Sequence, residues 1–339
     1  KMVAEALAVA SETGIHLISP IVVGHGTAGA LSAGDIDSAD EQIREMAGYA
    51  HHFDWIYIYF KIFKMWKAFL EQDFATALLE GESAKAQVAE SGMPMTDAVW
   101  HQGMAIASHA SGSPADASEH LEKALLISNR VGFHQIQFGC YLTQAEFALD
   151  AGDETAACHL LQKAMAIGNA KQYVTTWYWR PDVMTRLCLK ALEEEIEVDY
   201  VQHLIRRRRL MPEFPPLQIE KFPWPVKVFT LGRFSLIVDG TPISLAGKVQ
   251  EKPLFLLKAI ILLGGREISI DSLSDFLWPD ADGDLARGNF RTNLHRLRKI
   301  LGYYDAICMN SGSITLDPAY LWVDAWAFER TLSAADEIR

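Results

Sequence analysis

A basic segment near the C-terminus has the residue types and the spacing of a nucleic-acid contact. No acidic residue lies between Leu285 and Leu301, and apolar residues recur at i, i+4, i+7 and i+11 from Phe290. This spacing predicts a helix that buries one stripe and exposes a basic face. Arginine can bind guanine through two hydrogen bonds, asparagine can bind adenine, and further positive charges neutralise phosphate. The residues predicted to contact duplex DNA are Arg287, Arg291, Asn293, His295, Arg298 and Lys299.

Two further helices and two hairpins are predicted to position that face. The three predicted helices are Pro253–Leu263, Ile270–Trp278 and Leu285–Leu301. Pro253 suits the first turn of its helix, and Asp271 is expected to begin the second helix. Alternating apolar residues turn back at Asp239-Gly240, and a second small hairpin is predicted around Asn310-Ser311-Gly312. Strands, three helices and a terminal hairpin are together typical of an α+β winged helix-turn-helix domain.

The chain before residue 211 repeats one unit. The pairs Gly34-Asp35, Gln72-Asp73, Gly112-Ser113 and Gly152-Asp153 each precede an alanine by a fixed interval, and these alanines are 38, 40 and 40 residues apart. Each unit reads as a helix, a tight turn and a second helix, in which the small alanine lets the two helices pack closely. Units of this kind bury their faces only against their neighbours. We therefore predict a mostly α protein, with a tetratricopeptide-like α-solenoid before the winged helix-turn-helix domain.

A proline-rich stretch divides the two regions. Five of the 13 prolines fall between Met211 and Val226, and proline fixes φ and lacks an N–H group, so this stretch is predicted to be an extended linker that lies against a domain. The predicted domains are 1–210 (helical-repeat sensor), 211–225 (linker) and 226–339 (DNA binding). The formal net charge is −12, but residues 226–339 hold 13 Lys and Arg against 14 Asp and Glu. Because the field of the whole chain repels phosphate, a DNA contact must use the local basic face.

The first helix of each predicted repeat is rich in aromatic residues. In a tetratricopeptide array these helices line the concave face, where rings beside polar groups suit a flat or sugar-like ligand or a peptide. Most of these rings are expected to pack between helices. Trp177 to Arg180 are four bulky residues in a row that cannot all face the core, so at least one ring and Arg180 are expected to face the groove or a neighbour. The predicted effector-binding residues are Trp177, Trp179, Arg180, Trp100 and Tyr59.

Other chemistries find little support in the sequence. The four cysteines are 18, 30 and 120 residues apart, which is neither a disulfide framework nor a CxxC metal site and suits a reducing cytoplasm. The histidines lack the i, i+4 pairing or the carboxylate company of a metal site, so surface or capping roles are expected. No catalytic motif, no secretion signal and no apolar run of about 18 residues is present. We expect a cytoplasmic protein that is not an enzyme, has no catalytic or metal-binding residues and does not enter a membrane.

The second region resembles a known family. LGRFSLIVDGTPISL, LLGGREISIDSLSDFLWPD and NFRTNLHRLRKILG are similar to the OmpR-type winged helix of bacterial regulators related to the SARP group. Trp179-Arg180-Pro181 and the run that ends at Arg208 resemble the helical-repeat sensor region of large MalT-like activators. The resemblance implies a transcriptional activator that binds an inducer or partner in its repeats, contacts RNA polymerase and forms a dimer on DNA. An ATP-binding module of the STAND class would precede the repeats. The chain has no GxxxxGK[ST], so we expect no cofactor in it and a C-terminal fragment or a shorter relative.

These observations favour a transcriptional regulator whose helical repeats sense a ligand or partner and whose third helix reads DNA in the major groove. OmpR-type wings often carry an arginine, whereas the tip here, Asn310 to Ser313, is uncharged, so the third helix is expected to do most of the recognition. The alternative is a protein-interaction scaffold whose winged helix no longer binds DNA, which the net acidity and the neutral tip favour. The basic face opposes it, because protein interfaces are more often apolar at their centre. A third alternative, an enzyme acting on nucleic acid or sugar, lacks catalytic residues.

Overall fold

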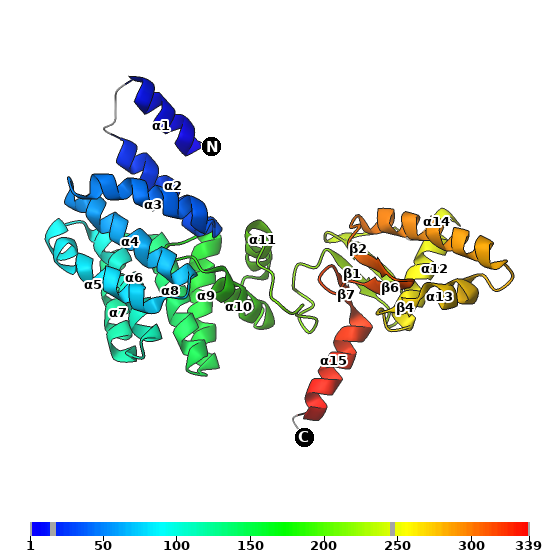
Figure 1. Cartoon of the computed structure of the whole chain (residues 1–339). Coiled ribbons are helices and arrows are strands. Elements are labelled where there is room, and N and C mark those ends of the chain that lie inside the picture. The colour runs from blue at the N-terminus through cyan, green and yellow to red at the C-terminus, as the bar shows by residue number, and fades with distance from the viewer. Residues whose placement is uncertain (1, 14–17, 245–247, 338–339) are drawn as a thin grey trace. The chain divides into compact units, whose positions relative to one another are not determined.

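The computed structural model describes residues 2–13, 18–244 and 248–337. The chain divides into two compact units, Lys1–Leu210 and Met211–Arg339, and each is described by itself. The described residues are mostly helical, and the sheet region is small and C-terminal, which confirms the prediction of a mostly α protein (Figure 1). No described helix combines the length and the apolar character that a bilayer crossing requires.

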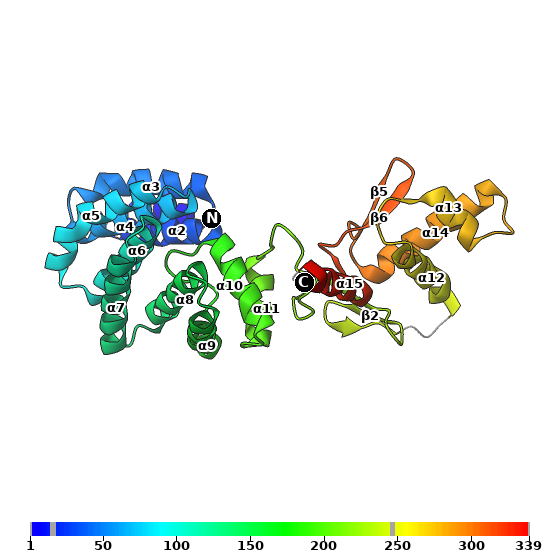
Figure 2. The ribbon, with the colours of Figure 1, turned by 90° about the horizontal axis from the view of Figure 1, so that it is seen from below.

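Helices make up the regular structure of the first unit. In its described part these helices are α1 (Met2–Thr13), α2 (Ser19–Ala33), α3 (Ile36–Ala50), α4 (Asp54–Leu70), α5 (Phe74–Ser91), α6 (Pro94–Ala110), α7 (Pro114–Val131), α8 (His134–Asp150), α9 (Glu154–Lys171), α10 (Pro181–Glu193) and α11 (Val198–Arg208). Consecutive helices pack as pairs across short turns: α2 with α3, α4 with α5, α6 with α7, and α8 with α9 (Figures 1 and 2).

The repeated sequence pairs form the turn inside each helix pair. Asp35, Asp73 and Asp153 cap the helices that follow them, each accepting a hydrogen bond from the backbone N–H three residues later over 3.1, 3.0 and 2.9 Å. The first residue of each of the four repeated pairs has a left-handed backbone. It is glycine in three of the turns and Gln72 in the second (φ 58°). The alanines that follow are buried and allow the helices to approach, with at most 1% of each exposed: Ala39, Ala77, Ala117 and Ala157.

The strands of the second unit form two small sheets. Among the described residues they are β1 (Val226–Phe229), β2 (Ser235–Val238), β3 (Thr241–Pro242), β4 (Ile268–Ser269), β5 (Ile307–Asn310), β6 (Ser313–Leu316) and β7 (Leu321–Val323). The sheet orders are β3-β2-β1-β7 and β4-β6-β5. Strand β1 is antiparallel to β2 and parallel to β7. The predicted turns at Asp239-Gly240 and Ser311-Gly312 each place two consecutive residues at positive φ, as a two-residue hairpin loop requires.

The second unit also has a helical layer. Its described helices are α12 (Lys248–Leu262), α13 (Ile270–Leu277), α14 (Gly283–Leu301) and α15 (Asp324–Glu337). One predicted helix start and one predicted capping residue are wrong. Helix α12 begins five residues before Pro253, so the proline lies in its second turn and removes one backbone hydrogen bond. Ser269 caps α13 instead of Asp271, because its hydroxyl accepts from the backbone N–H of Ser272 (3.3 Å).

The proline-rich stretch has neither helix nor strand, and it belongs to the second unit. Leu217, Phe222 and Trp224 are at most 4% exposed. The indole N–H of Trp322, on β7, donates to the Leu217 carbonyl over 2.7 Å. Apolar burial and this hydrogen bond hold the stretch against the unit, although its prolines exclude a regular ladder.

Asp324 ties the start of α15 to the loop after β1. Its carboxylate accepts hydrogen bonds from Thr230 N (2.7 Å), Thr230 Oγ1 (2.7 Å) and Leu231 N (2.9 Å). Burial raises the pKa of Asp324, but the bonds from Leu231 and Thr230 outweigh it and hold the pKa below its ordinary value. We therefore expect the charged form to stabilise the second unit.

Replacing Asp324 with alanine is expected to lower the free energy of unfolding by about 1.5 kcal/mol at pH 7, the size of one charge-assisted hydrogen bond. Because the folded-state pKa is lowered, this contribution is fully present above the unfolded pKa and is lost as the pH falls through the folded value. Urea unfolding at a series of pH values measures it, with Asp336→Ala, an exposed α15 carboxylate, as the control. Equal stability of wild type and Asp324→Ala at pH 7 would contradict the assignment.

Candidate nucleic-acid interface

Helix α14 separates a buried apolar face from an exposed basic face. Its buried residues are Ala286, Phe290, Asn293, Leu294, Leu297 and Leu301. Its exposed residues in the same span include Arg287, Arg291, Thr292, His295, Arg296 and Lys299. The apolar stripe packs on α12 and α13, and Figure 2 shows α14 in the same layer as these helices. Four of the six residues predicted to contact DNA therefore lie on the exposed face.

Two of the predicted contacts are wrong. Asn293 is 4% exposed and its amide N–H donates to the Asn289 carbonyl (2.8 Å), because position 293 falls on the edge of the apolar stripe. The Arg298 guanidinium donates to the Ile307 carbonyl (2.6 Å) and lies 3.9 Å from the Tyr304 ring centre. Arg298 thus joins α14 to the β5 strand instead of projecting outward.

Arg287 is exposed but already paired. Its guanidinium donates two hydrogen bonds to the carboxylate of Asp271 on α13, over 2.9 and 3.0 Å. This bidentate contact lowers the pKa of Asp271 and raises that of Arg287. It fixes the guanidinium near the start of α14 and neutralises part of its charge.

Asp271→Asn is expected to strengthen duplex binding by the full chain. The substitution removes the carboxylate that neutralises Arg287, so one more cation can meet phosphate. The plot of log affinity against log salt should then steepen by about 0.9, the value of one phosphate contact. Titration of a labelled duplex at several salt concentrations tests this, with Asp336→Asn as a charge-matched control remote in sequence. An unchanged slope would show that Arg287 stays away from the backbone.

The residues free to meet a ligand form a basic row beside a neutral hairpin. Arg291, Arg296 and Lys299 are exposed along α14. A cavity of about 290 Å³ lies at the N-terminal half of the row, and its lining includes Arg291, Asp271 of α13 and Gly312 at the turn between β5 and β6. The row supplies charge, and the turn supplies uncharged polar groups next to it.

The predicted effector site is filled by the chain itself. Residues Thr175–Arg180 lie in the non-helical connection between α9 and α10 and are called the inner segment below. Thr175 Oγ1 is 2.6 Å from Ser32 Oγ at the end of α2, and the Trp66 indole on α4 donates to the Trp179 carbonyl over 3.1 Å. Arg180 forms a buried ion pair with Glu146 of α8, with one N–H···O distance of 2.9 Å. The inner segment therefore contacts α2, α4 and α8.

Three of the four consecutive bulky residues are buried, and of the two placements expected for Arg180, the groove or a neighbour, the structure shows the neighbour. The exposed fractions of Tyr178, Trp179 and Arg180 are 3%, 1% and 8%. The reason is the backbone: Tyr178 has φ 53°, so successive side chains turn toward different helices. Glu146 supplies the charge partner that makes a buried guanidinium tolerable.

Glycines make room for the inner segment. A Cβ added to Gly103 on α6 would lie 2.5 Å from Tyr178 Oη, and one added to Gly139 on α8 would lie 2.5 Å from Thr176 Oγ1. The cavity left beside the segment is about 20 Å³, room for about one water molecule. An effector of ordinary size does not fit there.

The other predicted effector residues are also engaged. Trp100 is 4% exposed, and its indole donates to the Gly81 carbonyl (2.9 Å), so it lies outside the filled site and instead borders a separate cavity on α5, α6 and α7. Trp177 and Tyr59 are half-buried and lie with their ring centres 6.2 Å apart. Trp177 also stacks on Phe63 at 6.1 Å. These rings pack the inner segment against α4.

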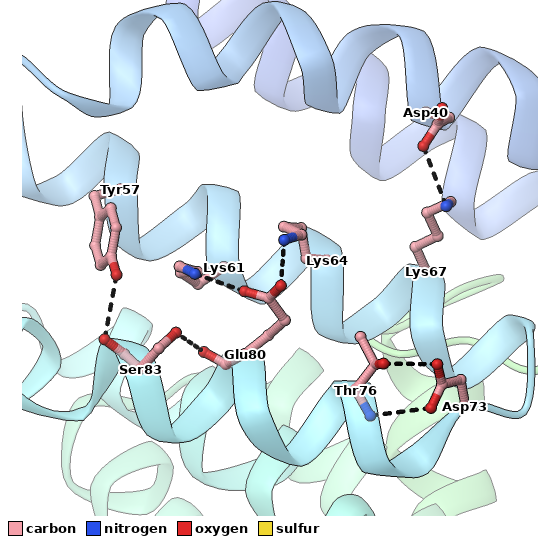
Figure 3. A network of polar contacts seen from close by, with 9 residues as sticks. All are labelled: Asp40, Tyr57, Lys61, Lys64, Lys67, Asp73, Thr76, Glu80 and Ser83. Carbon is pink, nitrogen blue, oxygen red and sulfur yellow. Dashed lines mark hydrogen bonds and ion pairs between the residues drawn. The ribbon is translucent and has the colours of Figure 1, made fainter.

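A network of charges on α4 and α5 serves to join these helices. Lys61 and Lys64 both pair with Glu80, which is 8% exposed, and Lys67 pairs with Asp40 of α3 over 3.1 Å (Figure 3). Burial raises the pKa of Glu80, but the two ammonium groups outweigh it and keep the pKa low. Because each of these charges has a partner within the protein, the network needs no ligand to balance its charges.

Sequence reasoning missed a pair of histidines that joins α6 to α7. His101 Nδ1 lies 2.7 Å from His120 Nδ1, and His101 Nε2 lies 3.5 Å from Asp97 Oδ1. Burial, helped by His120, lowers the pKa of His101 to about 4. The surface or capping role expected of the histidines is wrong for His101, which is largely buried beside an imidazole and a carboxylate. The i, i+4 spacing of Asp97 and His101 was the signal that could have found it.

Comparison with known proteins adds no relative. No family model, no curated protein and no solved structure matches the chain. Within the residues that the structure describes, no group of three or more His, Cys, Asp or Glu side chains is arranged to hold a metal ion. The exposed basic face of α14 is therefore the feature on which a function is argued.

Proposed function

We propose that the chain is a DNA-binding transcriptional regulator of the activator type. Its second unit would act as an OmpR-type winged helix, and its first unit as a tetratricopeptide-like sensor. The observation that supports this most is the exposed row of Arg291, Arg296 and Lys299 on α14, the third of the four described helices of its unit, which precedes a β-hairpin. Exposed cations without paired carboxylates, on a rigid helix, suit the phosphates and base edges of a duplex.

In this mechanism α14 enters the major groove, which is wide enough for one helix. Arg291 meets a base edge, and Arg296 and Lys299 neutralise phosphates. Arg287 contributes little charge to the interface while it stays paired with Asp271. Arg298 acts as a positioning residue, because its bond to the Ile307 carbonyl fixes the hairpin relative to the helix. The neutral turn at Ser311 can offer hydroxyl and backbone groups to a phosphate without adding charge.

Binding of the full chain to a random duplex pool across a salt series tests this proposal. Wild type is expected to select sequences and to weaken steeply with salt. The triple variant Arg291→Ala, Arg296→Ala, Lys299→Ala should lose binding. The control Arg206→Ala, Arg207→Ala removes two exposed cations from α11 and should keep it. No binding by wild type at low salt, or equal binding by the triple variant, would overturn the proposal.

The partners of the proposed regulator are double-stranded DNA, RNA polymerase and an effector, with a dimer on DNA. The cytoplasm is the compartment in which these meet. An effector that acts on the first unit would use a surface other than the inner face of the helix pairs, because the inner segment occupies that face. Co-purification of a small molecule or a protein with the full chain would identify it.

The second candidate function is a protein-interaction scaffold. Exposed apolar side chains on α12 and α13 favour it: Phe255 is 58% exposed, Leu262 78% and Phe276 60%. Apolar groups of this size at the surface are typical of protein interfaces when they gather. A Phe255→Ser, Phe276→Ser variant that keeps DNA binding but loses a captured partner would separate the two functions within one chain.

A further inference from the structure

The first unit has a second concave site, on α5, α6 and α7, that is independent of DNA binding. A cavity of about 560 Å³ opens there, and both histidines of the His101–His120 pair line it. The side chain of His101 is 13% exposed, so its ring is held by packing. The Trp100 ring lies edge-on to both imidazoles, with centre distances of 5.0 and 5.5 Å. The imidazoles are thus held in place beside solvent-accessible space.

The two rings meet through the atoms that bind metals. Their Nδ1 atoms are 2.7 Å apart, so one ring donates its proton to the other. Two imidazole nitrogens bound to one tetrahedral zinc ion, with bonds of 2.0–2.1 Å, are separated by about 3.3 Å. Binding of one ion between the rings therefore replaces their hydrogen bond and moves the two nitrogens about 0.6 Å further apart. His101 presents its other nitrogen to Asp97 at 3.5 Å, and a carboxylate in this position commonly orients a metal-binding histidine.

The charge of the cavity suits a cation. Among the described residues that line it are four carboxylates, from Glu82, Asp97, Asp116 and Glu119, and two ammonium groups, from Lys85 and Lys123. Glu119 pairs with Lys123, and Glu82 lies 3.5 Å from Lys85. The cavity lining as a whole therefore has an excess of negative charge, while the Lys123 ammonium is near enough to act on both imidazoles.

We propose that His101 and His120 bind a divalent cation that prefers imidazole ligands, of which Zn²⁺ is the probe chosen here. The two Nδ1 atoms supply the protein ligands, water molecules from the cavity complete the coordination, and Asp97 orients His101. The site joins α6 to α7, so an occupied site would hold this helix pair more firmly. Two side-chain ligands are fewer than a structural zinc site has, so the site is an exchangeable one.

Calorimetric titration of the full chain with ZnCl₂ at pH 7.5 tests the proposal. Wild type is expected to bind one Zn²⁺ through this site, and His101→Gln and His120→Gln should each weaken binding at least about tenfold. Asp97→Asn should weaken it by about 10–100-fold, the usual effect of losing an orienting carboxylate. The control His51→Gln, His52→Gln removes two exposed histidines and should leave this binding unchanged.

A second measurement does not depend on the heat of binding. Because a ligand that binds only the folded state stabilises it, Zn²⁺ should raise the unfolding temperature of wild type and of His51→Gln, His52→Gln, but not of His101→Gln. Far-UV circular dichroism shows that each variant keeps its helices. Absence of binding by wild type, or equal Zn²⁺ affinity and equal thermal shift in the folded His101→Gln variant, would overturn the proposal and leave the pair as a hydrogen bond between helices.

Discussion

Replacing Glu146 with alanine is expected to lower the free energy of unfolding of the first unit by about 3–5 kcal/mol, the usual effect of removing one partner from a buried ion pair. Both side chains of the Arg180–Glu146 pair are 9% exposed, so the Arg180 guanidinium would stay buried without its counter-charge. The loss should also release the inner segment, since Arg180 is its last residue. Urea unfolding followed by far-UV circular dichroism at pH 7 measures the change.

Two further variants separate charge from packing. Glu154→Ala removes a partner of Lys190. Because the Glu154 side chain is 62% exposed, this variant is expected to change stability by less than about 1 kcal/mol. The double variant Glu146→Leu, Arg180→Met replaces the pair with apolar groups and should recover most of the lost stability. A loss below about 1 kcal/mol for Glu146→Ala would mean that water reaches Arg180 when Glu146 is gone.

Replacing Arg291 with alanine is expected to weaken binding to a selected duplex by about 1–3 kcal/mol and to relax the preference at one base position, if Arg291 reads a base. Arg291 is exposed near the middle of α14. Lys299→Ala should behave differently, weakening all sequences alike and flattening the salt dependence by about 0.9. Selection from a random pool followed by titration distinguishes these patterns.

The matched control for Arg291 is Arg206→Ala, which removes an exposed arginine from the first unit and should leave both affinity and preference unchanged. Equal affinity of Arg291→Ala and wild type for selected and random DNA would remove Arg291 from the interface. A uniform loss across sequences would instead assign Arg291 to a phosphate.

Periodicity predicted most helices and turns. The pattern from Phe290 to Leu301 placed the buried stripe of α14, and the repeated alanines placed close helix contacts, because both depend on residues near in sequence. Starts of helices were less predictable: Ser269 and Asp271 are both good caps, and the backbone before the helix decides which is used. Pro253 shows the same difficulty, since a helix can begin a turn earlier when the core favours it.

The candidate sites were harder to predict, because tertiary partners decide what a side chain does. Asn293 and Arg298 have types that suit DNA, but the first is buried and the second bonds to a strand nine residues away in sequence. For Arg180 the sequence left open whether the side chain faces a groove or a neighbour, because its partner, Glu146, lies 34 residues earlier on another helix. His101 forms its close imidazole contact with His120, which lies on the next helix. Spacing on one helix can reveal the Asp97–His101 contact, but not a pair formed between two helices.

The inner segment also changes how the first unit must fold. In a linear array each helix pair contacts its neighbours alone, so end pairs can be removed one at a time and the remainder stays folded. Here Thr175 meets Ser32 across 143 residues of chain, and Trp179 meets Trp66 across 113. These contacts join the first pairs to the last, so truncation after α9 would uncover the aromatic face of α4. The unit should therefore unfold in a single cooperative transition and fold more slowly than an open array of its length.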